Sequence, residues 1–214
     1  MLLVAGLLAL DVAKACNPDV SRIEYPTADG GFMTGPEVTL ATPADRARVV
    51  DTVVAAFAND PAYRYFFDAS CLREQSEMYA GYLFDRRITQ GRIWIVEGGL
   101  SVSMWDSPDV DAGASKPDLP DEVLGRIAKF DGAVHPLFPS TPHWYLGNVA
   151  THPSYAGHRW GRKAIAAGLG EAEKAGLPAY LETATARNVG MYQRAGWSLV
   201  GETEDPIPAW VMRR

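Results

Sequence analysis

The sequence predicts one mixed α/β domain, and three observations support that prediction. The chain has 214 residues, a length that suits a single domain. Hydrophobic residues make up 47% of it and charged residues 21%, which is typical of a folded globular protein. Segments with helical and with strand periodicity alternate along the chain, and no internal repeat or low-complexity tract interrupts them.

The first 36 residues differ from the rest, and we expect an N-terminal extension or linker there. Residues 1–10 are almost wholly apolar, but a transmembrane helix needs about 20 such residues. No basic residue precedes them, as one would in an export signal, although residues 13–16 weakly resemble a cleavage site. A start site at Met33, a weak export signal and a short docking helix all stay open. We assign the domain itself to residues 37–214.

In the first half of the domain, strand signals alternate with helix signals. Residues 37–41 alternate like a short strand, and Thr42 with Pro43 then begins a helix that continues to Phe57. Residues 59–61 end that helix. The further elements expected here are a helix over 73–87, strands over 92–97 and 100–105 joined by Gly98 and Gly99, a loop over 106–120 and a helix over 121–130.

The second half has clearer signals. The pattern predicts a strand over 143–150, a glycine-containing loop, a helix over 160–175, a strand over 179–183, a short helix over 188–195 and strands over 197–201 and 209–213.

Charge and composition exclude several classes of function. The net charge is −6, which argues against nucleic acid and anionic membranes as partners. Two cysteines cannot build a disulfide scaffold or a cysteine-rich zinc site, and the four histidines show no metal-ligand spacing, so we expect no metal.

The loop before the helix at 160–175 is the basic exception in this acidic chain. Free N–H groups of a loop and of a helix N-terminus favour an anion. His158, Arg159, Arg162 and Lys163 crowd this helix start, where positive charge opposes the helix dipole. The segment therefore suggests an anion site, with an ordinary solvated turn as the alternative.

A second signal lies in the short helix near the C-terminus. Asn188 can cap that helix or contact a ligand, and Tyr192 follows one turn later on the same side. A phenol beside an anion site can donate a proton to a leaving group. The alternative is that Tyr192 only packs in the core.

These stretches resemble the GNAT superfamily of N-acetyltransferases. The resemblance rests on residues 149–153, 155–161 and 181–183, on Asn188 and Tyr192, and on Gly196-Trp197, and it extends over roughly 37–214. Within the family, the chain most resembles the puromycin N-acetyltransferases, on residues 38–43, 55–61 and 181–183 and around Trp105.

The resemblance implies a fold, an activity and a cofactor. The fold would be a mostly antiparallel, twisted sheet flanked by helices, with a splayed central strand pair that holds acetyl-CoA. The activity would be direct transfer of an acetyl group from acetyl-CoA to the primary amine of a small molecule, puromycin-like or another amine. The enzyme would be cytoplasmic and a monomer or homodimer. A silent module that binds CoA as a sensor and a protein N-terminal acetyltransferase are the alternatives.

The resemblance also assigns residues. Those implied in acetyl-CoA binding are Val149, Ala150, Thr151, Gly157, His158, Arg159, Trp160, Gly161, Arg162, Asn188 and Tyr192. Ala156 and Arg159 depart from the family's phosphate-loop pattern, in which a glutamine or arginine and a glycine stand at these positions. Either the loop still binds, with side chains of Arg159 or His158 on a phosphate, or it binds CoA more weakly.

For catalysis, Tyr192 matches the family's general acid, and Glu182 is our candidate general base. Pairing with Arg187 or capping of the next helix is the alternative role for Glu182. The acceptor pocket should come from the N-terminal half, with an aromatic wall suited to an aryl acceptor. Its candidate residues are Asp60, Tyr63, Tyr65, Phe66, Trp105 and Trp144, with a core role as the alternative for each.

Overall fold

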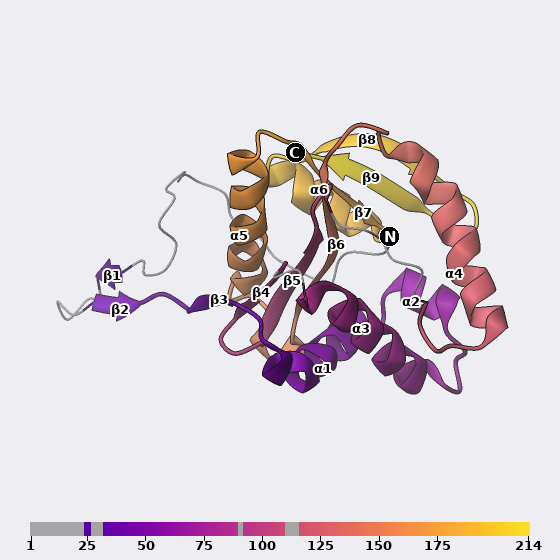
Figure 1. The fold of residues 1–214 in the computed structure, drawn as a ribbon, viewed down its shortest axis with the longest axis horizontal. Helices are drawn as coiled ribbons and strands as arrows, with labels where there is room; N and C mark the ends of the chain where they lie inside the picture. The colour runs from indigo at the N-terminus through magenta and orange to yellow at the C-terminus, as the bar shows by residue number, and fades with distance from the viewer. Residues whose placement is uncertain (1–23, 27–31, 90–91, 110–115) are drawn as a thin grey trace.

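A seven-stranded sheet forms the centre of the domain (Figure 1). The computed structural model describes residues 24–26, 32–89, 92–109 and 116–214. Across the sheet the strands run β3 (Val38–Leu40), β4 (Ile93–Val96), β5 (Ser101–Asp106), β6 (Trp144–Thr151), β7 (Ala179–Thr183), β9 (Ala209–Arg213) and β8 (Ser198–Thr203). Only β6 and β7 pair in parallel, and the other neighbours are antiparallel. The predicted mixed, mostly antiparallel sheet is thus confirmed.

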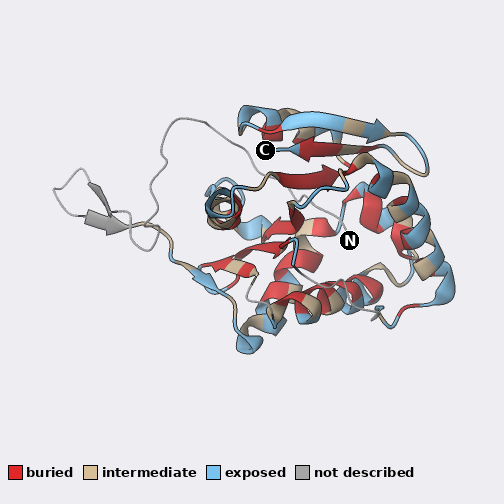
Figure 2. Ribbon diagram, turned by 45° about the horizontal axis from the view of Figure 1, so that its top comes forward, coloured by how far each residue is buried: buried red, intermediate tan, exposed pale blue. Residues whose placement is uncertain are grey.

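Helices cover both faces of this sheet, and each face has its own apolar core. On one face lie α1 (Arg46–Phe57), α2 (Pro61–Phe66), α3 (Leu72–Ile88), α4 (Asp121–Val134) and the 3₁₀ turn η2 (His135–Leu137). On the other lie α5 (Trp160–Lys174) and α6 (Ala186–Arg194). The inner strands are buried between the two helical layers, whereas β8 at one edge is largely exposed (Figure 2).

Most of the predicted N-terminal extension, residues 1–36, lies outside the described residues. Within it, β1 (Glu24–Pro26) and β2 (Phe32–Thr34) pair antiparallel where we expected only linker. Among the described residues, no helix combines the length and the apolar character needed to cross a bilayer.

The start of the first helix follows the predicted capping signal. Thr42 and Asp45 bond reciprocally, and the Thr42 backbone N–H donates to Asp45 Oδ2 at 2.7 Å. A 3₁₀ turn, η1 (Pro43–Asp45), comes first and leads into α1. The apolar face of α1 then packs Val49, Val53 and Phe57 into the core with no exposed surface.

One expected helix end is confirmed and one expected helix start is wrong. Residues 59–61 end α1 as predicted, but they also begin α2, because the Asp60 carboxylate accepts from the backbone N–H groups of Ala62 and Tyr63. The short helix α6 begins at Ala186, so Asn188 lies in its first turn and Thr185 is the capping residue. An Asn in the first turn of a helix resembles a cap in sequence, because both positions favour short polar side chains.

A bulge in the middle of the sheet shapes the site. The β5–β6 register shifts between Met104 and Trp105, which leaves Gly147 without a partner in the ladder. A Cβ at Gly147 would lie 2.3 Å from Arg87 Nη2 and 2.9 Å from Tyr145 Cε1. Only glycine therefore lets the buried guanidinium of Arg87 lie against β6 at this point.

Candidate active site

The parallel strands β6 and β7 separate after a short contact. They pair only at Trp144 with Ala179 and at Tyr145 with Tyr180, although β6 continues to Thr151 and β7 to Thr183. Beyond these pairs, each strand presents backbone N–H and C=O groups toward the other without bonding to it, which is the condition for an extended ligand to pair with β6. Val149, Ala150 and Thr151, which we predicted to bind the cofactor, lie on this open part of β6 and are buried.

The predicted anion loop connects β6 to α5 through a tight turn. Gly157 has φ +88°, and Arg159 at the helix N-cap has φ +61° and ψ +18°, in the left-handed region. A left-handed residue with a Cβ costs roughly 1–2 kcal/mol, so the arginine adopts the backbone that glycine adopts more easily. The departure from the family pattern at Arg159 therefore leaves the turn in place. The N-terminus of a helix favours an anion through its backbone N–H groups, although the N–H of Arg162 already donates to the carbonyl oxygen of Arg159 at 3.2 Å.

The other predicted loop residues gather at the same turn. The Trp160 ring stacks on Tyr155 at 5.0 Å between centroids and lies 5.2 Å from the His158 ring. Gly161 is buried in the first turn of α5, and Arg162 is partly exposed beside it. The structure thus brings Gly157 to Arg162 together at the start of α5, as predicted.

Helix α6 places Asn188 and Tyr192 against the sheet. Asn188 is 3% exposed, and its Nδ2 donates to Thr183 Oγ1 at 3.3 Å. Tyr192 is 1% exposed, and its hydroxyl has no hydrogen-bond partner among the described residues. Burial, and to a lesser degree the charge of Glu182, raises the pKa of this phenol above its usual range. An unpartnered buried hydroxyl costs about 1–3 kcal/mol, so a ligand atom that accepts its hydrogen bond would be a natural partner.

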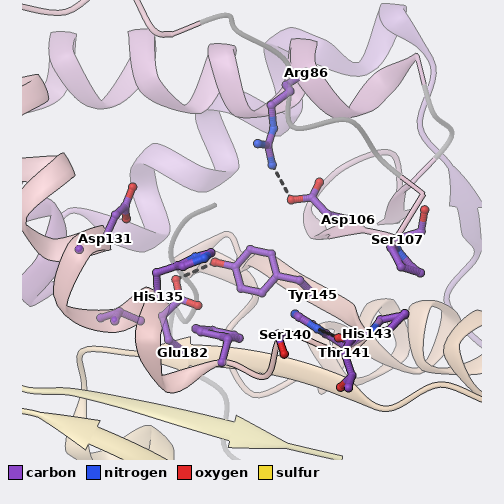
Figure 3. Close-up of a pocket in the computed structure, with 15 residues that line it drawn as sticks. Arg86, Asp106, Ser107, Asp131, His135, Ser140, Thr141, His143, Tyr145 and Glu182 are labelled. Atoms are coloured by element: carbon purple, nitrogen blue, oxygen red, sulfur yellow. Dashed lines mark hydrogen bonds and ion pairs between the residues drawn. The ribbon is translucent and has the colours of Figure 1, made fainter.

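A cavity of about 770 Å³ opens on the opposite face of the sheet (Figure 3). Its walls are the end of α3, the residues after β5, α4 with η2, the loop over 140–143, Tyr145 of β6 and Glu182 of β7. Successive residues of a strand point to opposite faces. Leu181 therefore packs in the same core cluster as Tyr192, whereas Glu182 faces the cavity.

Glu182 is buried in this cavity, 2% exposed, and it is held by hydrogen bonding. The Tyr145 hydroxyl donates to Glu182 Oε1 at 2.7 Å (Figure 3). Asp131 of α4 lines the same cavity, and burial, together with the charge of Glu182, raises the pKa of Asp131 to about 8. A buried and a half-buried carboxyl group within electrostatic reach cannot both ionise at low cost, so this end of the cavity can hold a proton.

The predicted acceptor wall lies elsewhere. Tyr63 and Phe66 are fully buried among α1–α4, Tyr65 is partly exposed, and Asp60 caps α2. Burial raises the pKa of Asp60 to about 7, against the effect of its two backbone N–H donors. Trp105 and Trp144 pack with each other at 6.5 Å in the other core. None of these six residues lines the cavity, and their burial favours the core role that we kept as the alternative.

Several cavity residues were absent from the sequence prediction: Arg86, Asp106, Ser107, Asp131, Tyr145 and His143. They come from four separate segments of the chain, and no short motif joins them. Among the described residues, no group of three or more His, Cys, Asp or Glu is arranged to hold a metal ion.

Comparisons with known proteins agree with this geometry. A model of the Acetyltransferase (GNAT) family matches residues 118–197, from just before α4 to just after α6. A solved histone acetyltransferase HPA2 and related acetyltransferase from Corynebacterium glutamicum is 26% identical, covers 84% of this chain and 95% of its own, and has a TM-score of 0.60. A mosquito arylalkylamine N-acetyltransferase like 5b is 12% identical, with 84% and 99% covered and a TM-score of 0.56.

An agmatine N-acetyltransferase is also similar in fold, at 10% identity, with 84% of this chain and 98% of that chain covered and a TM-score of 0.56. At this level of identity the likeness to the two amine acetyltransferases concerns the fold alone.

Proposed function

We propose that this chain is an acetyl-CoA-dependent N-acetyltransferase of the GNAT family and that it acetylates the primary amine of a small molecule bound in the cavity beside Glu182. One observation carries the proposal. Where β6 and β7 separate, a buried carboxylate, Glu182, faces a cavity on one side of the sheet, and a buried, unpartnered hydroxyl, Tyr192, lies on the other side. A base and an acid on opposite sides of an opening fit a transfer between two ligands.

The residues present fit acetyl-CoA. The open backbone of Val149 to Thr151 can pair with the amides of an extended pantetheine arm. The N–H groups at Gly157 to Gly161, together with the charge of Arg162, can hold the pyrophosphate. Asn188 would lie beside the thioester end of the bound pantetheine arm. When bound, acetyl-CoA supplies a thioester whose acetyl carbonyl carbon is attacked by the amine.

Glu182 would begin the reaction by taking a proton from the ammonium form of the acceptor, so that a neutral amine attacks the acetyl carbon. The Tyr145 hydroxyl, bonded to Glu182 Oε1, would hold the carboxylate in place. Tyr192 would then donate its proton to the departing sulfur, as the carbon–sulfur bond breaks and the amide bond forms. The nitrogen would lose its second proton to solvent, and solvent would return a proton to Tyr192 and take the one held by Glu182. The raised pKa of Tyr192 keeps that proton on the phenol at neutral pH.

The next question is which primary amine is the acceptor substrate. The sequence resemblance makes puromycin the first compound to test, and two proteins of similar fold are named for arylalkylamines and for agmatine. These compounds share a primary amine and differ in size and charge, so a panel of them would define the acceptor class.

Replacement of Glu182 by Gln tests the proposed base. We expect kcat/KM to fall by about 10²–10⁴, the usual contribution of a general base. Calorimetry should show that Kd for CoA changes little, because Glu182 faces the other side of the sheet. Glu171→Gln on α5 is the matched control, since the Glu171 carboxylate accepts from Lys174 Nζ at the surface, with 40% of its side chain exposed. Full activity of the Glu182→Gln enzyme would show that Glu182 is not the general base.

Two other outcomes would redirect the proposal. Tight CoA binding without turnover of any amine would indicate a binding module. Acetylation of peptide N-termini, but not of small amines, would indicate a protein acetyltransferase.

A further inference from the structure

The cavity contains two buried polar groups that have no partner among the described residues, and both lie near Asp106. They are the Nε–H of Arg86 and the hydroxyl of Ser107. The Arg86 side chain is 9% exposed and Ser107 is 5% exposed, yet both line the cavity (Figure 3). A buried donor without an acceptor lowers stability, so two of them at one end of a cavity indicate a ligand group that completes them.

The guanidinium of Arg86 is fixed in place by a buried ion cluster. Asp106, at the end of β5, accepts from Arg86 Nη2 through Oδ2. Arg87 holds the same carboxylate with both Nε and Nη2, at 2.8 Å each, and its side chain is fully buried. Asp106 therefore has little freedom to turn, and Arg86 is anchored at its Nη2 with its Nε–H still available.

Charge separates the two ends of the cavity. Burial opposes ionisation of Asp106, but Arg87 and Arg86 outweigh it and hold the pKa of Asp106 below its usual range. Two guanidinium groups and one carboxylate leave this end with one net positive charge. Asp131 and Glu182 make the other end acidic, and Figure 3 places them across the Tyr145 ring from Asp106 and Ser107.

We propose that Arg86 and Ser107 bind a carbonyl or carboxylate oxygen of the acceptor, while its amine lies at Glu182. This inference rests on the proposed function, and it narrows the acceptor to amines that carry such an oxygen, as amino acids and their amides do. Arg86 Nε–H and Ser107 Oγ–H donate to the oxygen, and the apolar side chains of Val134 and Phe138, which also line the cavity, can contact the body of the acceptor.

A trio of matched acceptors tests the proposal: phenethylamine, phenylalaninamide and phenylalanine. They share the amine and the aromatic body, and they differ in having no oxygen, a carbonyl or a carboxylate. We expect the native enzyme to favour an oxygen-bearing acceptor over phenethylamine by about 10- to 100-fold in kcat/KM, the range for hydrogen bonds to a charged group. Preference for the acid or for the amide identifies which oxygen is bound.

Ser107→Ala and Arg86→Lys should each reduce that preference by about tenfold or more. Ser107→Ala removes only an unpartnered hydroxyl and should fold normally, which a thermal unfolding curve checks. Ser76→Ala, a buried serine of α3 outside the cavity, is the matched control and should keep the native preference. Equal kcat/KM for all three acceptors, or a preference unchanged in both cavity variants, would overturn the proposal.

Calorimetry separates a failure of this inference from a failure of the proposed function. If no member of the trio is acetylated, the Kd values of the three compounds still measure the preference. Tighter binding of the oxygen-bearing compounds that is lost in Ser107→Ala would support the inference even without turnover. Equal Kd values would reject it.

Discussion

Replacement of Tyr192 by Phe should change activity and stability in opposite directions. The hydroxyl is buried and has no hydrogen-bond partner among the described residues. Its removal takes away an unsatisfied polar group that costs about 1–3 kcal/mol, while the ring keeps its packing against Trp197 at 5.8 Å between centroids. We therefore expect the free energy of unfolding to stay constant or rise by about 1 kcal/mol, which raises Tm by roughly 2–4 °C for a domain of this size.

Activity should fall in the same variant. A positioned general acid contributes about 10²–10⁴ to the rate, so kcat should drop by that factor while Kd for CoA changes little. The assay is thiol release from acetyl-CoA, run beside thermal unfolding of the same sample. Tyr79→Phe is the matched control, because Tyr79 is also 1% exposed with no hydroxyl partner among the described residues, but it packs in the other apolar core and does not line the cavity. It should gain similar stability and keep full activity. Native kcat in Tyr192→Phe would refute the acid role.

Three further predictions follow from the backbone and the charges. Arg159→Gly should leave stability within about 1 kcal/mol, because relief of the left-handed backbone offsets the flexibility of glycine. Calorimetry at low salt should show a higher Kd for CoA in this variant. An unchanged Kd would exclude a contact between Arg159 and a phosphate of CoA. Gly147→Ala should lower the free energy of unfolding by about 1–3 kcal/mol through overpacking against Arg87, and a native urea midpoint would contradict that contact. The pKa of Asp131 is raised to about 8 from 3.8, so the folded state keeps the Asp131 proton up to a higher pH than the unfolded state does. The free energy of unfolding should therefore fall as the pH rises from 4 to 8. This one group can contribute at most about 1.4 kcal/mol per pH unit. Asp131→Asn should flatten that slope in urea unfolding at pH 5 and 8, and equal slopes would contradict the raised pKa.

The proposed cofactor side of the site could be predicted from the sequence because its parts are local. A strand, a glycine-containing turn and a helix start are adjacent in the chain, so their periodicity and capping residues locate Val149 to Arg162 together. Asn188 and Tyr192 are one helical turn apart, and a spacing of four residues places both on one face. The structure confirms these elements to within a few residues.

The cavity that we propose for the acceptor could not be predicted in this way. Its cavity joins residues from α3, β5, α4, β6 and β7, and the packing of the whole domain decides which side chains face it. Aromatic residues such as Tyr63 and Phe66 have the composition of a ligand wall, but the same residues fill a core, and sequence alone does not distinguish the two. The bulge at Gly147, which admits Arg87, is likewise a tertiary feature.

The acetyl transfer itself is the central claim, and one measurement tests it most directly. The purified chain is mixed with acetyl-CoA and a panel of primary amines that includes puromycin, phenethylamine, phenylalaninamide and agmatine. Thiol release is followed together with the mass of the amine. We predict amine-dependent release of CoA and a product heavier by one acetyl group. Measurable CoA binding with no thiol release for any amine would contradict the account.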